Sequence, residues 1–316
     1  MNDQGQCHPL VTALTPGALW FSNLSVAAVV PLSCWVLGRP SLAWVRILEP
    51  DGRSAASLRS CFTVDVENER STRNLLDKLA NDPSAVESRS AVCEAVSAAL
   101  THLGKVLWLT GYVVGPDRKS GESPFKFGDD RAVGIATVVQ IGGELGTGTI
   151  QLLRGGNRYA ASALIRQIVE VEYLAHAFAA ESDEAAEWLR AGRKERLAFW
   201  SPSKLRKRSA NVFLASDYSQ HCERGGHPTT EGMSLLPHHD GLGENYLWVD
   251  LAGHLASVWK NVEVLAERLL GGPIPAHWKM PDVAAALSAW HRADDLYAAL
   301  GDLARRLRDV DASGSS

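Results

Sequence analysis

A helix that is apolar on nearly every face carries two opposite charges. The stretch from 158 to 178 reads RYAASALIRQIVEVEYLAHAF and places Arg166 and Glu170 four residues apart. Side chains at this spacing lie on one face of a helix, so the two can form an ion pair. An all-round apolar helix is normally buried, and a buried charge must be paired or shift its pKa. We expect the pair inside the protein, either as a clamp between helices or as part of a site.

A second pair with the same spacing, Glu172 and His176, lies about a third of a turn from the main apolar face. Two couples that can pair on one apolar helix exceed what solubility requires. The alternatives are structural salt bridges that hold neighbouring helices in register and groups that take part in a functional site.

A histidine-rich segment follows between 211 and 240. On a helix, Asp217 and His221 are one turn apart, and a carboxylate placed there can fix the imidazole tautomer and raise its basicity. Tyr218 and Cys222 form the adjacent couple. Gly225-Gly226 predicts a helix end, which leaves His227 at the mouth of a turn. Histidine is the usual general acid or base near neutral pH, so His221 and His227 are candidate catalytic residues.

His238, His239 and Asp240 complete this segment, either as solvated loop residues or as part of the same site. The histidine spacings match no standard helix-borne ligand pair, since HExxH places its imidazoles at i and i+4. We therefore predict no metal site, and no motif indicates a cofactor.

A basic run occupies 193–208 and holds seven Lys or Arg residues against the single acid Glu195. Basic side chains interleaved with Phe199 and Trp200 can hold phosphates and stack bases, which makes RNA a candidate partner. The alternative is a solvated helix end, where cations are favoured in any case. The candidate nucleic-acid-binding residues are Lys204, Arg206, Lys207 and Arg208.

Composition narrows the function classes. The formal net charge of −4 over 316 residues argues against a chain whose whole surface binds nucleic acid. The five cysteines are odd in number and form no CxxC pair, which favours reduced thiols and a cytoplasmic location. The sequence has no P-loop, no GxGxxG after a strand, no GxSxG and no kinase motif set.

The segment from 18 to 38 is uncharged and long enough to cross a bilayer. Pro31 interrupts it and polar residues dilute it, so two short buried segments are favoured over a membrane anchor. No basic residue precedes it, as a secretory signal would require.

The segments that hold these candidate residues in place are predicted to be mainly helical. Turn signals between 45 and 66 suggest a short β hairpin, and a Gly/Ser-rich charged stretch at 118–130 suggests a boundary near 120. We expect an irregular, then helical, N-terminal region at 1–120. Residues 121–316 should form a bundle of about five or six helices, at 131–154, 158–178, 182–200, 211–223, 244–270 and 281–310. The very short break at 155–157 predicts an antiparallel hairpin of the first two.

Several short motifs resemble a bacterial all-helical family of unknown function. They are Leu164-Ile165-Arg166 with Glu170, then Tyr218-Ser219, then His227-Pro228, within residues 125–270. That family is loosely similar to HEPN domains, helical bundles that often act as RNA-cleaving toxins or defence effectors. The HEPN signature places Arg four to six residues before His on one helix. No Arg precedes a His at that spacing here, so a nuclease would assemble Arg166 and His227 from separate helices.

Two functions follow as expectations. The first is a binding or interaction protein, in bacterial stress or defence, whose Arg166, Glu170, Tyr218 and His227 form a buried polar network. The second is a metal-independent, HEPN-like ribonuclease with His227 or His221 as general base and Arg166 stabilising phosphate charge. RNA through 193–208 and a second copy of the chain are the candidate partners, and a membrane is not expected.

Overall fold

The computed structural model describes residues 71, 74–113, 128–210, 212–237, 243–275, 278 and 280–299. These are almost entirely helical and contain no strand, which confirms the mainly α prediction. The predicted hairpin at 45–66 and the candidate anchor at 18–38 lie outside the described residues.

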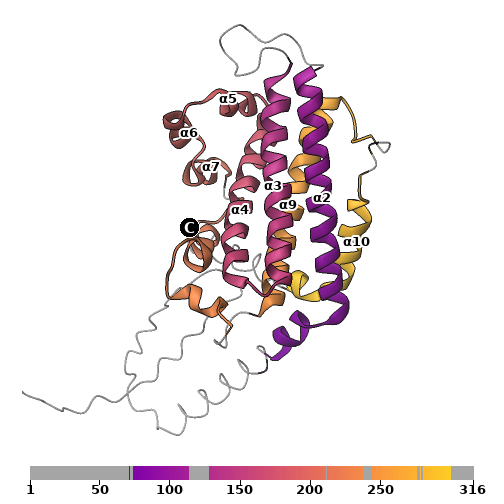
Figure 1. Ribbon diagram of the computed structural model, residues 1–316, viewed down its shortest axis with the longest axis vertical. Coiled ribbons are helices and arrows are strands. Elements are labelled where there is room, and N and C mark those ends of the chain that lie inside the picture. The colour runs from indigo at the N-terminus through magenta and orange to yellow at the C-terminus, as the bar shows by residue number, and fades with distance from the viewer. Residues whose placement is uncertain are drawn as a thin grey trace, which may run out of the picture. The chain divides into compact units, whose positions relative to one another are not determined.

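Four long helices form the centre of the described chain: α2 (Pro83–Val113), α3 (Asp130–Arg154), α4 (Arg158–Ala180) and α9 (Glu244–Leu270). They run side by side in Figure 1, and their buried aliphatic and aromatic side chains form one continuous core. The turn at 155–157 makes α3 and α4 antiparallel, as expected.

The closest helix packing is between α2 and α3, and it depends on glycine. A Cβ added to Gly143 would lie 2.7 Å from the backbone nitrogen of Thr101, and one added to Gly146 would lie 3.1 Å from Cβ of Ser97. Backbone atoms cannot yield as a side-chain end can, so only a residue without a side chain permits this approach.

The connection from α4 to α9 carries most of the candidate functional residues. It contains α5 (Glu184–Arg190), α6 (Arg193–Phe199), α7 (Pro202–Arg208), α8 (Ala215–His221), the π-helical turn η1 (Cys222–Gly226) and the 3-10 turn η2 (Glu231–Leu235). In Figure 1, α5, α6 and α7 lie to one side of α4, and α4 also contacts α7, α8 and η1. A long crossover of this kind replaces the short loops of a simple up-and-down bundle.

The described residues after 121 form at least eight α-helices, α3 to α9 together with α10 (Val283–Ala293), which exceeds the five or six predicted for 121–316. The expected helix at 182–200 is two helices, since Gly192 adopts an extended backbone (φ −71°, ψ 169°) and begins α6. The expected helix at 211–223 is shorter, with η1 taking over at Cys222. The seven-residue α7 was not predicted at all.

The helices on both sides of the expected boundary near 120 share one core. Val96, Leu100 and Leu103 of α2 are fully buried in the cluster that contains Ile135, in α3, and Ile165, in α4. The reason is that α2 supplies a long apolar face that α3, α9 and α10 cover. Among the described helices, α2 alone is long and apolar enough to cross a membrane by length and composition, and half of that stretch is buried.

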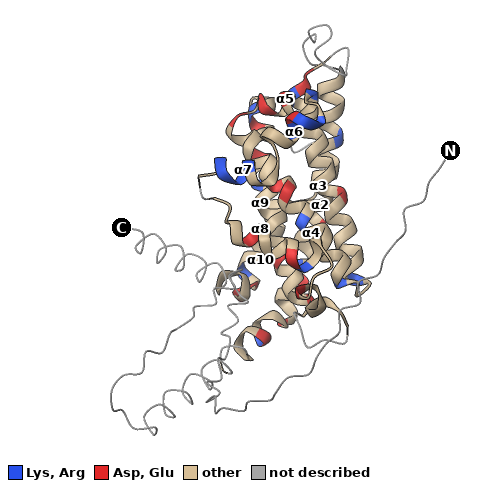
Figure 2. Ribbon diagram, turned by 90° about the vertical axis from the view of Figure 1, so that its left-hand side faces the viewer, with Lys and Arg blue, Asp and Glu red and all other residues tan. Residues whose placement is uncertain are grey.

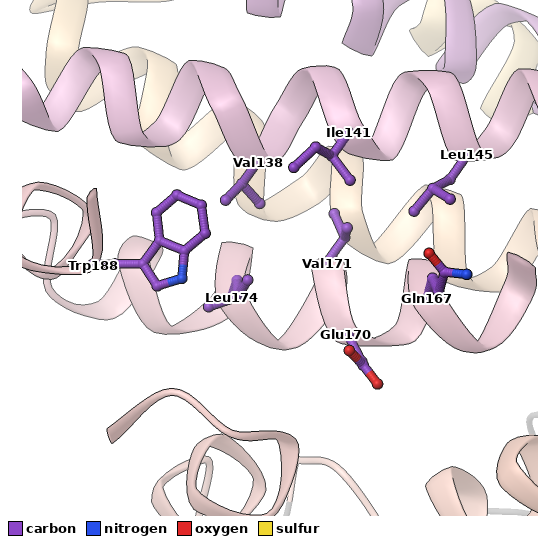
Figure 3. A pocket seen from close by; sticks show the side chains of 8 residues that line it. All are labelled: Val138, Ile141, Leu145, Gln167, Glu170, Val171, Leu174 and Trp188. Atoms are coloured by element: carbon purple, nitrogen blue, oxygen red, sulfur yellow. The ribbon is translucent and has the colours of Figure 1, made fainter. Parts of the chain in front are cut away.

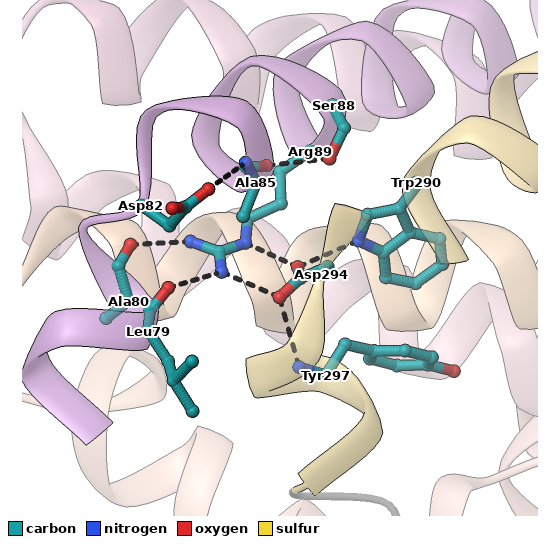
Figure 4. Close-up of polar contacts among 9 residues, drawn as sticks. All are labelled: Leu79, Ala80, Asp82, Ala85, Ser88, Arg89, Trp290, Asp294 and Tyr297. Atoms are coloured by element: carbon teal, nitrogen blue, oxygen red, sulfur yellow. Dashed lines mark hydrogen bonds and ion pairs between the residues drawn. The ribbon is translucent and has the colours of Figure 1, made fainter. Parts of the chain in front are cut away.

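A buried ion pair interrupts the helix predicted at 281–310. α10 stops at Asp294, and the chain is helical again at 295–299. Asp294 accepts hydrogen bonds from Arg89, and both side chains are fully buried (Figure 4). Arg89 also donates to the carbonyl oxygens of Leu79 and Ala80, while Asp294 accepts from Trp290 Nε1 at 2.9 Å. Every charge in this group is therefore compensated, as burial requires.

Candidate functional site: two polar clusters on either side of α8

The Arg166 network consists of Arg166, Glu170, Tyr218 and Cys222. The ion pair between Arg166 Nη2 and Glu170 Oε1 is 3.0 Å long. The Tyr218 hydroxyl accepts from Arg166 Nη2 at 3.0 Å and donates to Glu170 Oε1 at 2.8 Å. Arg166 Nε donates to Cys222 Sγ at 3.3 Å. The network thus connects α4 with α8 and the start of η1.

This network lies at the edge of the core and not inside it. The side chains of Arg166 and Glu170 keep 26% and 35% of their exposure, although the apolar sequence predicted full burial. The reason is that α8 and η1 cover this side of α4 in place of another long helix. Each charged group has a polar partner. The network therefore holds α8 and η1 against α4, while one side of it stays exposed to water.

A shallow groove adjoins Glu170 on its other side. It has a volume of about 160 Å³ and lies between α3 and α4, with Val138, Ile141 and Leu145 on one wall. Figure 3 shows Trp188 at one end, while the Glu170 carboxylate points away from α3. Gln167 and Glu170 also line the groove, so its walls are mixed, with the apolar side chains of α3 facing the more polar side of α4.

The histidine cluster lies on the neighbouring face of α8, since Asp217 and His221 each precede a member of the Arg166 network by one residue, about 100° round the helix. His221 Nε2 is 3.1 Å from His254 Nε2, which comes from α9. His254 Nδ1 is 2.8 Å from Glu172 Oε2, from α4. Asp217 and Asp250 complete the cluster, with Asp217 Oδ1 3.7 Å from His221 Nε2 and Asp250 Oδ1 3.5 Å from His254 Nε2.

The two imidazoles differ in their pKa because their surroundings differ. Burial lowers the pKa of His221 below its ordinary value, and the carboxylate of Asp250 offsets this only in part. Burial alone would also lower the pKa of His254, but hydrogen bonds to Asp250 and Glu172 outweigh it and raise that pKa well above its ordinary value. The cluster therefore places an imidazole with a lowered pKa, His221, in contact with one with a raised pKa, His254.

Two members of this cluster, Asp250 and His254, were missed by the sequence interpretation. They are four residues apart on α9, as Asp217 and His221 are on α8, so the same spacing rule could have found them. Glu172 was expected to pair with His176, but it pairs with His254. The His176 ring packs edge-on against Phe213 at a centroid distance of 5.1 Å.

His227 is placed apart from both clusters. Its carbonyl oxygen accepts from the Tyr159 hydroxyl at 3.0 Å, but its side chain is exposed and has no polar partner among the described residues. The expected network of Arg166, Glu170, Tyr218 and His227 is thus assembled except for His227, since η1 ends just before it and directs it to solvent. His238, His239 and Asp240 lie outside the described residues.

The basic run forms α6 and α7 on the surface (Figure 2). None of the residues of α6 is buried, and Leu205 is the one buried residue of α7. Arg208 forms two hydrogen bonds with Glu184, at 2.7 and 3.1 Å. The Arg206 guanidinium lies over the Tyr218 ring at 5.8 Å, so the basic run adjoins the Arg166 network.

No family model, no curated protein and no solved structure matches this chain. The resemblance to a HEPN-like family thus stays a prediction from its short motifs.

Proposed function

We propose that this protein is an RNA-binding helical bundle, with α6 and α7 as the contact surface and the Arg166 network as the clamp that holds the crossover on α4. The observation that carries the proposal is the exposure of apolar side chains within the basic run. Leu197 is 61% exposed and Phe199 is 59% exposed, between the cations of α6 and those of α7. Exposed aromatics among cations suit single-stranded RNA, whose bases stack while phosphates are neutralised.

The charges of this surface are available to a ligand. Lys204 and Lys207 are exposed and form no ion pair or hydrogen bond within the described chain. The acid Glu195, by contrast, is engaged in capping α6, where its carboxylate accepts from the backbone nitrogen of Gly192 at 2.9 Å. The surface is therefore strongly positive in a chain of negative net charge.

The experiment is RNA binding by fluorescence anisotropy with a labelled single strand of about twenty nucleotides, across a salt series. Each phosphate contact of a single strand contributes about 0.7 to the slope of log affinity against log salt. The double variant Lys204→Ala/Lys207→Ala should therefore reduce that slope by about 1.4, twice this amount. The matched control, Lys78→Ala/Lys105→Ala, removes the same charge from two exposed positions, one before α2 and one within it, and should leave the slope unchanged. Equal slopes in both double variants would rule out this surface.

Phe199→Ala separates stacking from charge. Loss of one base–aromatic stack should weaken binding by about 1–3 kcal/mol with no change in the salt slope. An unchanged affinity would mean that no base stacks on Phe199 and that RNA is held only by the attraction between cations and phosphates.

A metal-independent ribonuclease is the alternative, and the contact of Arg206 with Tyr218 favours it, because RNA held on α7 would lie beside Arg166. It requires a general base close to Arg166, and the exposed His227 is the nearest candidate along η1. RNA degradation by the unchanged protein and by His227→Ala tests this alternative. Cleavage that disappears in the variant, with the fold intact, would favour the ribonuclease over simple binding.

A further inference from the structure

Two histidines from different helices direct the same ring nitrogen toward one point. His221 Nε2, on α8, and His254 Nε2, on α9, are 3.1 Å apart, and Asp217 Oδ1 is 3.7 Å from the first of them. One donor atom from each of these three residues lies within 4.8 Å of the other two. Two nitrogens and an oxygen converging in this way form the donor set that a divalent transition metal prefers.

We propose that Asp217, His221 and His254 bind one divalent transition-metal ion of the zinc class. This goes beyond the RNA-binding proposal and does not depend on it. The ion would link α8, at the end of the crossover, with the core helix α9.

The distances fit such an ion closely. Two ligands about 2.0–2.1 Å from zinc in a tetrahedral arrangement are about 3.3 Å apart. The two imidazole nitrogens, at 3.1 Å, are already within a few tenths of an ångström of this value. The Asp217 oxygen must move slightly closer, and its side chain is 41% exposed and free to do so.

Each imidazole has a carboxylate near its second ring nitrogen, and for His254 the contact is that of a metal-binding histidine. Such a histidine directs its second ring nitrogen to a carboxylate or a carbonyl, which fixes the tautomer. His254 Nδ1 is 2.8 Å from Glu172 Oε2, and His221 Nδ1 is 3.7 Å from Asp250 Oδ2. Glu172 is within hydrogen-bonding distance of the second nitrogen of His254. Asp250 would have to come closer to accept a hydrogen bond from His221, and its other oxygen lies 3.5 Å from His254 Nε2.

Charge and access also suit a cation. Asp217, Asp250 and Glu172 place three carboxylates around the two imidazoles, and the guanidinium of Arg224 interacts with two of them, Asp217 and Asp250. With both imidazoles neutral, as metal ligands are, the carboxylates still outnumber this one cation, so a divalent ion would balance the remaining negative charge. His221 is buried, whereas Asp217 and Asp250 keep 41% and 30% of their side-chain exposure. The ion can reach the site on the side of these two acids. Three protein ligands would leave a fourth position for water, as in open zinc sites.

The histidine spacings predicted no metal site because only ligand pairs within one segment were considered. The actual pattern is Asp-x3-His twice, Asp217 with His221 and Asp250 with His254, on helices that meet only in the fold. Neither couple alone distinguishes a ligand pair from an ordinary helix salt bridge.

The test is calorimetric titration of the full chain, stripped with a chelator, with zinc ions alone. We expect one zinc per chain, with affinity reduced at least a hundredfold in His221→Asn and in His254→Asn. Glu172→Gln, which alters only the carboxylate behind His254, should weaken binding roughly tenfold to a hundredfold. The matched control is His176→Asn, since His176 lies on α4 outside the cluster and should leave binding unchanged.

Asp217→Asn keeps the test decisive if the buried-histidine variants fail to fold, because Asp217 is the most exposed ligand. It should remain folded by circular dichroism and still lose zinc affinity. X-ray absorption of the zinc-loaded protein should show nitrogen and oxygen ligands at about 2.0–2.1 Å and no sulfur. Absence of binding, unchanged binding in Asp217→Asn, or a sulfur ligand from Cys222 would each overturn the proposal.

Discussion

Replacing Tyr218 with phenylalanine isolates the hydroxyl that joins α8 to α4. This hydroxyl accepts from Arg166 and donates to Glu170, and the two charged groups also contact each other at 3.0 Å. The substitution therefore removes two hydrogen bonds while the ion pair stays intact. No buried charge is left without a partner, so the loss reports the hydroxyl alone.

The magnitude follows from the partners and their exposure. A hydrogen bond to a charged group contributes about 1.5–3 kcal/mol when it is shielded from water. The side chains of Arg166 and Glu170 are 26% and 35% exposed, so water replaces part of both bonds. We expect Tyr218→Phe to lower the free energy of unfolding by about 1–2 kcal/mol in total.

Tyr173 provides a matched control on the same surface of α4. Its ring packs against that of Tyr218 at a centroid distance of 6.0 Å, and it is 1% exposed. Its hydroxyl is buried without a hydrogen-bond partner among the described residues, and burial is the main reason that its pKa is raised. Tyr173→Phe removes an unsatisfied polar group, so stability should be unchanged or higher by up to about 1 kcal/mol.

Urea unfolding followed by circular dichroism measures both variants. With an unchanged dependence on urea, the midpoint for Tyr218→Phe should fall by roughly 0.5 M. The midpoint for Tyr173→Phe should stay or rise. If Tyr173→Phe lowers the free energy of unfolding as much as Tyr218→Phe does, the loss comes from altered ring packing. The hydrogen bonds of the Tyr218 hydroxyl would then not stabilise the fold.

Three further substitutions test the fold around the site. Asp294→Asn leaves the guanidinium of Arg89 buried with no countercharge, which should cost about 3–5 kcal/mol by thermal unfolding. Glu94→Gln, in the exposed pair with Arg154, should cost less than about 1 kcal/mol, and similar losses in both would contradict the assigned burial. Gly225→Ala would place a Cβ 2.6 Å from the backbone of α4, so we expect urea unfolding to show a loss of about 1–3 kcal/mol. A neutral result would mean that η1 does not rest on α4.

The long helices could be predicted because their signals are local. Apolar periodicity and the Gly155-Gly156-Asn157 break predicted α3 and α4 within two residues of their observed ends, and α9 was predicted with its observed ends. The N-cap contacts agree with this interpretation, since Asn157 accepts from the backbone nitrogen of Ala160. Such features depend on residues a few positions apart, which a single sequence displays.

The site could be predicted only in part, because its pairings are long-range. Arg166, Glu170 and Tyr218 were grouped through a resemblance, and 48 positions separate Glu170 from Tyr218. Glu172 had a suitable local partner in His176 and still pairs with His254, 82 positions away. Asp294 lies within the predicted helix 281–310, and its buried partner Arg89 is 205 positions away, so no local pattern indicates the pair. Glu172 could pair with a nearby or a distant histidine, and the packing of α4 against α9 determines that it pairs with the distant one.

The short helix α8 makes the two polar clusters dependent on each other. A seven-residue helix is not stable by itself in water, so α8 must be held by its tertiary contacts. The Tyr218 hydroxyl donates a hydrogen bond to Glu170 of α4, and the His221 ring contacts His254 of α9. An ion bound by Asp217, His221 and His254 would restrict α8 and so strengthen the bonds of Tyr218. By linkage, loss of the Tyr218 hydroxyl must then weaken zinc binding by the same factor that zinc strengthens the clamp.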